Sequence, residues 1–172
     1  MSAKKLRLLL LKDCNRTCKG CCNNEWDLSE LPICDTFDGY STVILTGGEP
    51  LLVPEVIKSV VARVREENPK APVIVYTAWR EDPELLLDIL QIVDGITLTL
   101  HTRKDTAPLE TFSELVSKHE LNKVKSLRLN VFRGVSTGTA DLAGWDVRKG
   151  LAWIKECPLP QDEVFMRLRT AT

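Results

Sequence analysis

Residues 73–100 read VIVYTAWREDPELLLDILQIVDGITLTL, and this stretch decides the fold class. Val73–Tyr76 is a β-branched and aromatic run, which is typical of a strand. Asp82 followed by a proline predicts a helix start, and apolar residues at helical spacing predict that the helix continues to Val93. Ile96–Leu100 then alternates apolar residues with threonine, which indicates a second strand. A strand, a helix and a strand in succession predict a parallel βαβ unit.

The same alternation extends to both sides of this unit and predicts an α/β protein with six parallel strands. A short helix is expected between the first two strands, and all crossovers are expected to be right-handed. Such an alternation fits an open doubly wound sheet or a curved partial barrel, and in either case ligands bind at the C-terminal ends of the strands. The further strands are predicted at Leu6–Leu11, Thr42–Leu45, Leu127–Phe132 and Val164–Leu168, and the further helices at Pro54–Glu67, Pro108–Glu120 and Asp141–Glu156.

The later strands each carry one polar face, because successive side chains of a strand point to opposite sides. Thr97, Thr99 and His101 share one face, and Arg128 and Asn130 share another. A parallel strand covered by helices on both sides is apolar on both faces, so a polar face indicates either solvent or a cavity that holds a polar ligand. We favour the cavity, and with it a curved sheet.

Length and charge exclude several classes of protein. The 172 residues predict a single domain, residues 1–172. Lys and Arg number 23 against 24 Asp and Glu, so the net charge of −1 argues against bulk nucleic-acid binding. The longest apolar run, Leu8–Leu11, is too short to span a membrane, and the N-terminus does not resemble a signal peptide. We therefore expect a cytoplasmic protein that does not bind membranes.

Four of the six cysteines lie within nine positions, which indicates metal or redox chemistry before disulfides. Cys14, Cys18 and Cys21 have the spacing Cys-x3-Cys-x2-Cys directly after the first predicted strand. Thiolates select zinc, copper(I) or iron–sulfur clusters. Cys34 would complete a four-cysteine zinc site, whereas three thiolates would leave one iron of a [4Fe–4S] cluster open to another ligand. The remaining cysteines, Cys22 and Cys157, have no assigned role, and Cys157 is expected to be inert.

The cysteine spacing resembles the cluster motif of the radical S-adenosylmethionine (SAM) superfamily. The segment Thr46–Leu51, which reads TGGEPL after the second strand, is similar to the Gly-Gly-Glu segment of that family. The resemblance implies a partial (β/α)6 TIM-like barrel of near-minimal length and a [4Fe–4S] cluster held by the three cysteines. It also implies that SAM chelates the open iron and is cleaved to a 5′-deoxyadenosyl radical. The protein would then be an enzyme of the oxidoreductase type, with a flavodoxin or ferredoxin as its electron donor.

The resemblance also implies residues that bind SAM or substrate. Gly47, Gly48 and Glu49 would bind the amino end of SAM, and further predicted contacts lie on the later strands: Thr77, Thr99, His101, Arg128 and Asn130. The catalytic residues are not assigned.

The substrate stays open at this level. The Gly-Cys-Cys-Asn run at residues 20–23 is similar to activases of anaerobic ribonucleotide reductases, whose partner is a glycyl-radical protein. The polar strand faces are more like small-molecule enzymes such as 7-carboxy-7-deazaguanine synthase. We therefore expect a small polar molecule, a nucleotide or a peptide as substrate. Two other functions remain open, a zinc-binding interaction module that uses Cys34 and a simple electron carrier.

Overall fold

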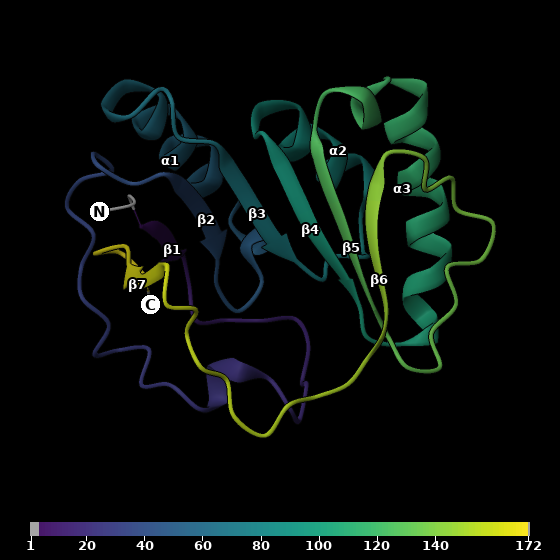
Figure 1. The fold of residues 1–172 in the computed structure, drawn as a ribbon, viewed down its shortest axis with the longest axis horizontal. Coiled ribbons are helices and arrows are strands. Elements are labelled where there is room, and N and C mark those ends of the chain that lie inside the picture. The colour runs from purple at the N-terminus through teal and green to yellow at the C-terminus, as the bar shows by residue number, and fades with distance from the viewer. Residues whose placement is uncertain (1–3, 172) are drawn as a thin grey trace. The chain divides into compact units, whose positions relative to one another are not determined.

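The computed structural model describes residues 4–171, which form two compact units. The first unit contains residues 4–75 and 153–171, and the second contains residues 76–152. Figure 1 shows the elements of both. The strands are β1 (Lys5–Leu9), β2 (Thr42–Thr46), β3 (Val73–Thr77), β4 (Gly95–Leu100), β5 (Ser126–Phe132), β6 (Trp145–Leu151) and β7 (Glu163–Arg167). The helices are α1 (Pro54–Glu67), α2 (Pro83–Ile92) and α3 (Thr106–Lys118), with short 3-10 helices η1 (Cys22–Asn24), η2 (Pro50–Leu52), η3 (Arg103–Asp105) and η4 (Leu121–Lys123).

The first unit is built on strands in the order β7-β1-β2-β3, all parallel. In register, Leu6 of β1 lies between Val43 of β2 and Val164 of β7. Leu6 and Val43 are fully buried, as are Ile57 and Val64 of α1. Burial of these aliphatic side chains is the main source of stability for this unit.

The second unit contains the parallel strands β4-β5-β6 together with α2 and α3. The Asp82 carboxylate accepts hydrogen bonds from the backbone N–H groups of Glu84 and Leu85, so it caps the start of α2 as the sequence predicts. Phe112 of α3 packs edge-to-face against Trp145 of β6, with ring centroids 6.1 Å apart. The apolar faces of the strands are therefore the ones that meet the helices.

One predicted helix, Asp141–Glu156, is wrong, because residues 145–151 form β6 instead. Gly144 and Gly150 have φ values of +82° and +75°, which a right-handed helix does not accommodate. Trp145 and Val147 alternate with polar residues and pair in register with Leu127 and Leu129 of β5. Apolar residues in this segment alternate with the period of two of a strand, and this alternation, not the helical spacing, matches the structure.

The α/β class is confirmed, with seven strands in the described residues where the sequence predicts six. The expected short helix between the first two strands is present only as the three-residue 3-10 helix η1. Within neither unit do the described strands close on themselves, so the predicted partial barrel is not confirmed. No helix in residues 4–171 has the length and apolar character needed to cross a membrane.

Candidate metal centre

The three predicted cluster cysteines line a single cavity of about 390 Å³ in the first unit. None of the three is in a disulfide; Cys14 is exposed, and Cys18 and Cys21 are half-buried. A turn brings the last two together, because the Cys21 N–H donates to the Cys18 carbonyl oxygen at 3.1 Å. The cavity therefore presents three soft sulfur donors from eight consecutive loop residues, 14–21, that follow β1.

Lysine and arginine side chains surround these thiols. Lys12, Arg16 and Lys19 line the same cavity. Positive groups beside the cavity would offset the negative charge of a thiolate-bound cluster or of a ligand carboxylate. Arg16 and Lys19 belong to the cysteine motif itself, and the structure adds Lys12.

Gly47 and Gly48 lie against the backbone that leads into the cysteine loop. A Cβ atom at Gly48 would lie only 1.9 Å from the Asp13 carbonyl oxygen, and one at Gly47 would lie 2.9 Å from the Leu11 carbonyl oxygen. The Gly48 and Glu49 N–H groups donate to these same carbonyl oxygens of Leu11 and Asp13, both at 2.9 Å. Both glycines are thus required by close contact between two backbone segments. Gly48 also lines the cavity.

Glu49 is buried, with 1% of its surface exposed. Its Oε1 accepts a hydrogen bond from the Leu51 N–H at 3.1 Å and caps η2. Partial desolvation is the main cause of a raised pKa at the Cys14 thiol, the Arg16 backbone N–H opposes it, and the Glu49 carboxylate adds to it. Glu49 therefore lies close enough to the cysteine loop for its negative charge to oppose ionisation of the Cys14 thiol.

Two asparagines that follow the cysteines hold the loop in place. The Asn23 Nδ2 donates to the Gly47 carbonyl oxygen at 2.8 Å, and the Asn24 Nδ2 donates to the Cys18 carbonyl oxygen at 3.5 Å. Both side chains also line the cavity. Sequence reasoning assigns neither residue a role, although both directly follow the Cys-Cys pair.

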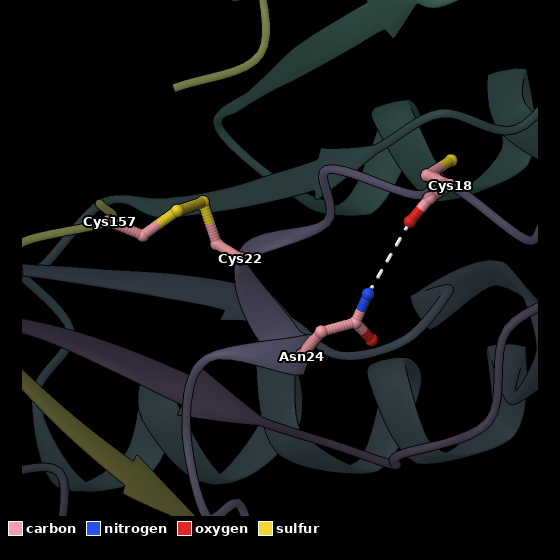
Figure 2. The surroundings of a disulfide bond; sticks show 4 residues. All are labelled: Cys18, Cys22, Asn24 and Cys157. Carbon is pink, nitrogen blue, oxygen red and sulfur yellow. Dashed lines mark hydrogen bonds between the residues drawn. A yellow bond between two sulfur atoms is a disulfide. The ribbon is translucent and has the colours of Figure 1, made fainter. Parts of the chain in front are cut away.

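A disulfide joins Cys22 to Cys157, with the two Cα atoms 5.6 Å apart. Figure 2 shows this bond beside η1, with Asn24 directed toward Cys18. The expectation that Cys157 is inert is wrong. The two cysteines are 135 positions apart, so no local pattern in the sequence indicates that they pair.

Cys34 lies apart from the three loop cysteines. It is buried, its Sγ contacts the Thr36 carbonyl oxygen at 3.2 Å, and burial raises its pKa. Among residues 4–171, no group of three or more His, Cys, Asp or Glu side chains is arranged around a single metal ion. Cys34 does not line the cavity of the other three, so the structure does not assemble the four-cysteine zinc site.

The remaining predicted ligand contacts lie in the second unit. Thr99 of β4 is paired in register with Asn130 of β5, and the His101 ring packs edge-to-face on Phe132 with centroids 4.8 Å apart. Thr77 is buried, and its hydroxyl oxygen accepts the Trp79 N–H at 2.9 Å. The structure thus brings Thr99 and Asn130 together, and the role of these four residues in ligand binding stays a prediction.

Arg128 has a partner within the protein. Its Nε donates to the Asp146 carboxylate of β6 at 3.0 Å, and both side chains are exposed. The charge of Arg128 is therefore paired with Asp146, a residue of β6 in the range where the sequence predicts a helix.

Comparison with known families gives a match over the first part of the chain. A family model described as a 4Fe-4S single cluster domain matches residues 5–106, a range that contains the cysteine loop, the Gly-Gly-Glu segment and α1 to η3. A comparison with curated proteins finds no match.

Proposed function

This chain belongs to the 4Fe-4S single cluster domain family, whose model covers more than half of its residues, and on that premise we propose that it is a radical SAM enzyme. A [4Fe–4S] cluster bound at such a site supplies the electron that splits SAM into methionine and a 5′-deoxyadenosyl radical. The radical would take a hydrogen atom from a small polar molecule, a nucleotide or a peptide.

One observation carries this proposal: among the described residues, three cysteines that are not in disulfides, and no fourth, line the same cavity as Gly48. Proteins usually hold a [4Fe–4S] cluster with four cysteines, so three leave one iron for a non-protein ligand. A zinc module or a simple electron carrier has no need for that open position. In the described residues the three sulfurs are not gathered around one point, so they would have to move together to bind a cluster. The number and the chemistry of the donors suit a cluster and favour an enzyme that binds a second molecule at it.

The surrounding residues have roles consistent with this proposal. Cys14, Cys18 and Cys21 would hold the cluster, and Lys12 and Lys19 would offset its charge. Gly48 lines the cavity and lets its backbone lie directly against that of Lys12 and Asp13, which lead into the cysteine loop. The Glu49 carboxylate would attract the ammonium group of SAM to the Gly48 side of the cavity. Its negative charge reaches the cysteine loop, because it also raises the pKa of Cys14.

The proposal includes the fold and the partners expected from the sequence. The α/β units would belong to a partial barrel, and a low-potential flavodoxin or ferredoxin would supply the electron. The basic side chains around the cavity favour such a donor, because flavin and iron–sulfur carriers present negative groups near their redox centres.

The test is anaerobic reconstitution of the full chain with ferrous iron and sulfide, followed by dithionite and SAM. We expect about four irons per chain, a cluster signal in the electron paramagnetic resonance spectrum that changes when SAM is added, and 5′-deoxyadenosine by mass spectrometry. Cys18→Ser should lose both iron and product. Cys34→Ser is the matched control, because Cys34 is a buried thiol outside the cavity, and it should retain both.

Two results would contradict the proposal. A full complement of iron without any 5′-deoxyadenosine would leave an iron–sulfur protein that is not a radical SAM enzyme. One zinc and no iron, lost in Cys34→Ser, would support the zinc module instead.

A further inference from the structure

The C-terminal segment that enters the first unit lies directly on the cysteine loop. Trp153 packs on Gly20 so closely that a Cβ atom there would lie 2.6 Å from two ring atoms. Four residues later, Cys157 is bonded to Cys22. Residues 153–157, here called the strap, are therefore attached to the loop at two points, one on each side of the predicted cluster ligand Cys21.

The strap buries little surface. Trp153 and Ile154 are 45% and 61% exposed, and the rest of the strap is exposed except for Cys157. A short exposed segment of this kind opens at low free-energy cost. The disulfide adds a covalent link that keeps the strap on the loop when its packing opens.

The position of this disulfide is chemically unusual. Cys21 must be a thiolate to bind iron, while Cys22, the next residue, is oxidised. An environment that keeps Cys14, Cys18 and Cys21 reduced also contains thiol reductants that act on an accessible disulfide. A permanent disulfide and three permanent thiols within nine residues are hard to reconcile, whereas a disulfide that forms and breaks with conditions is consistent with both.

From these contacts we propose that Cys22 and Cys157 form a redox-controlled clasp that fastens the strap over the cysteine loop under oxidising conditions and releases it under reducing ones. Two thiol groups of a dithiol reductant break the S–S bond, Cys22 and Cys157 each take up a proton, and the reductant leaves as a disulfide. A disulfide oxidant of the same class reverses the reaction.

The fastened strap covers the backbone of Gly20 beside Cys21. The strap residues do not line the cavity of the three cysteines, so the strap would act on the cluster through the backbone of the loop. With the strap fastened, the loop is held on both sides of Cys21; with the strap released, Cys21 is held less firmly and iron should leave more easily. The disulfide and the Trp153 contact are independent of the proposed function, whereas the argument that the clasp opens and closes, and its effect on the cluster, rest on that function.

The clasp is tested first on the full chain without cluster, so that the result is independent of the proposed activity. Samples equilibrated with oxidised or reduced dithiothreitol are blocked with N-ethylmaleimide, and the disulfide peptides are mapped by mass spectrometry. We expect a Cys22–Cys157 peptide in the oxidised sample and its loss on reduction. Absence of this peptide, or pairing of Cys157 with another loop cysteine, would overturn the clasp.

Release of the strap is then measured by trypsin cleavage after Lys155, which is exposed in the middle of the strap. Reduction, or Cys157→Ser, should speed this cleavage roughly tenfold, because opening no longer has to break a covalent link. Gly20→Ala should speed it further in the reduced protein by displacing Trp153. Ile154→Ala is the control inside the strap and should cleave like the wild type, because Ile154 is mostly exposed. Equal cleavage rates in oxidised and reduced wild type would overturn the proposal.

The effect on the cluster is a separate measurement on reconstituted protein. Loss of iron to a ferrous chelator, followed by absorbance, should be several-fold faster in Cys157→Ser than in oxidised wild type, and equal in Cys34→Ser and wild type. If cleavage depends on the clasp but iron loss does not, the clasp stands and its action on the cluster is disproved.

Discussion

The Asn23 side chain joins the two segments that form the candidate site, because its Nδ2 donates to the Gly47 carbonyl oxygen at 2.8 Å. Asn23 lies in η1, two residues after Cys21, and Gly47 lies just after β2. The bond therefore connects the end of the cysteine loop to the start of the Gly-Gly-Glu segment.

Removal of this bond should loosen the loop that holds the metal. Asn23→Ala leaves the Gly47 carbonyl without this donor, which costs about 1 kcal/mol in the free energy of unfolding by the usual value for one hydrogen bond. We expect faster iron loss to a chelator from the reconstituted protein. The control is Asn24→Ala, whose bond to Cys18 is 3.5 Å long and weak, so its effect should be smaller. A larger effect at Asn24 would contradict the assigned role of Asn23.

The sequence predicts the strands and helices whose periodicity is locally complete. The elements of residues 73–100, the Pro54 helix and the spacing of the three cysteines each follow from a pattern within a single short segment. The Cys22–Cys157 bond and the Gly48 contact with Asp13 depend on residues brought together only by the folded chain. Neither contact has a local pattern, so neither could be predicted.

The helix predicted at Asp141–Glu156 shows why local spacing can mislead. Its weak points, Gly144 and Gly150, turn out to be the residues that decide the structure, because both adopt positive φ. The same glycines fit a poor helix or a strand with turns, and the pairing of Trp145 and Val147 with β5 selects the strand.

Gly150→Ala distinguishes these two structures by the sign of its effect. In a helix this change stabilises by roughly 1 kcal/mol, because alanine has the higher helix propensity. At φ +75° with open space around it, the alanine should instead destabilise by about 1 kcal/mol. Chemical denaturation of wild type and variant gives the sign, and a more stable variant would contradict the assignment of β6.

The contacts of Glu67 predict that the free energy of unfolding falls at acid pH. Its carboxylate accepts the Phe37 N–H at 2.8 Å and pairs with Arg63 at 2.7 Å, and these contacts, the Phe37 bond first, lower its pKa below the ordinary 4.5. A lowered pKa means that the stabilisation is complete above the unfolded pKa and is lost as the pH falls through the folded one.

The wild type should therefore lose more stability than Glu67→Gln when the pH is lowered from 6 to about 3, as measured by urea denaturation at each pH. Above pH 6 the difference between the two proteins should be constant. Glu55→Gln is the control, because Glu55 is on the same helix and only contacts exposed Lys58. Parallel pH profiles for wild type and Glu67→Gln would show that Glu67 does not contribute in this way.

Gly48→Ala provides the most direct test of how the site is built. The added methyl group would lie 1.9 Å from the Asp13 carbonyl oxygen and 2.5 Å from that of Lys12, and both contacts are with backbone that has no rotamer to change. The two segments must separate, which breaks the hydrogen bonds that Gly48 and Glu49 donate to Leu11 and Asp13. We expect the variant to bind little iron on reconstitution, while circular dichroism shows that its helices persist.

Gly39→Ala is the matched control for Gly48→Ala. It also places an alanine at a strained φ, +78°, but nothing lies within 4 Å of the new methyl group. Its free energy of unfolding should fall by about 1 kcal/mol, and its iron content should be full. Normal iron binding by Gly48→Ala would mean that contact between these backbones is not what shapes the cysteine cavity.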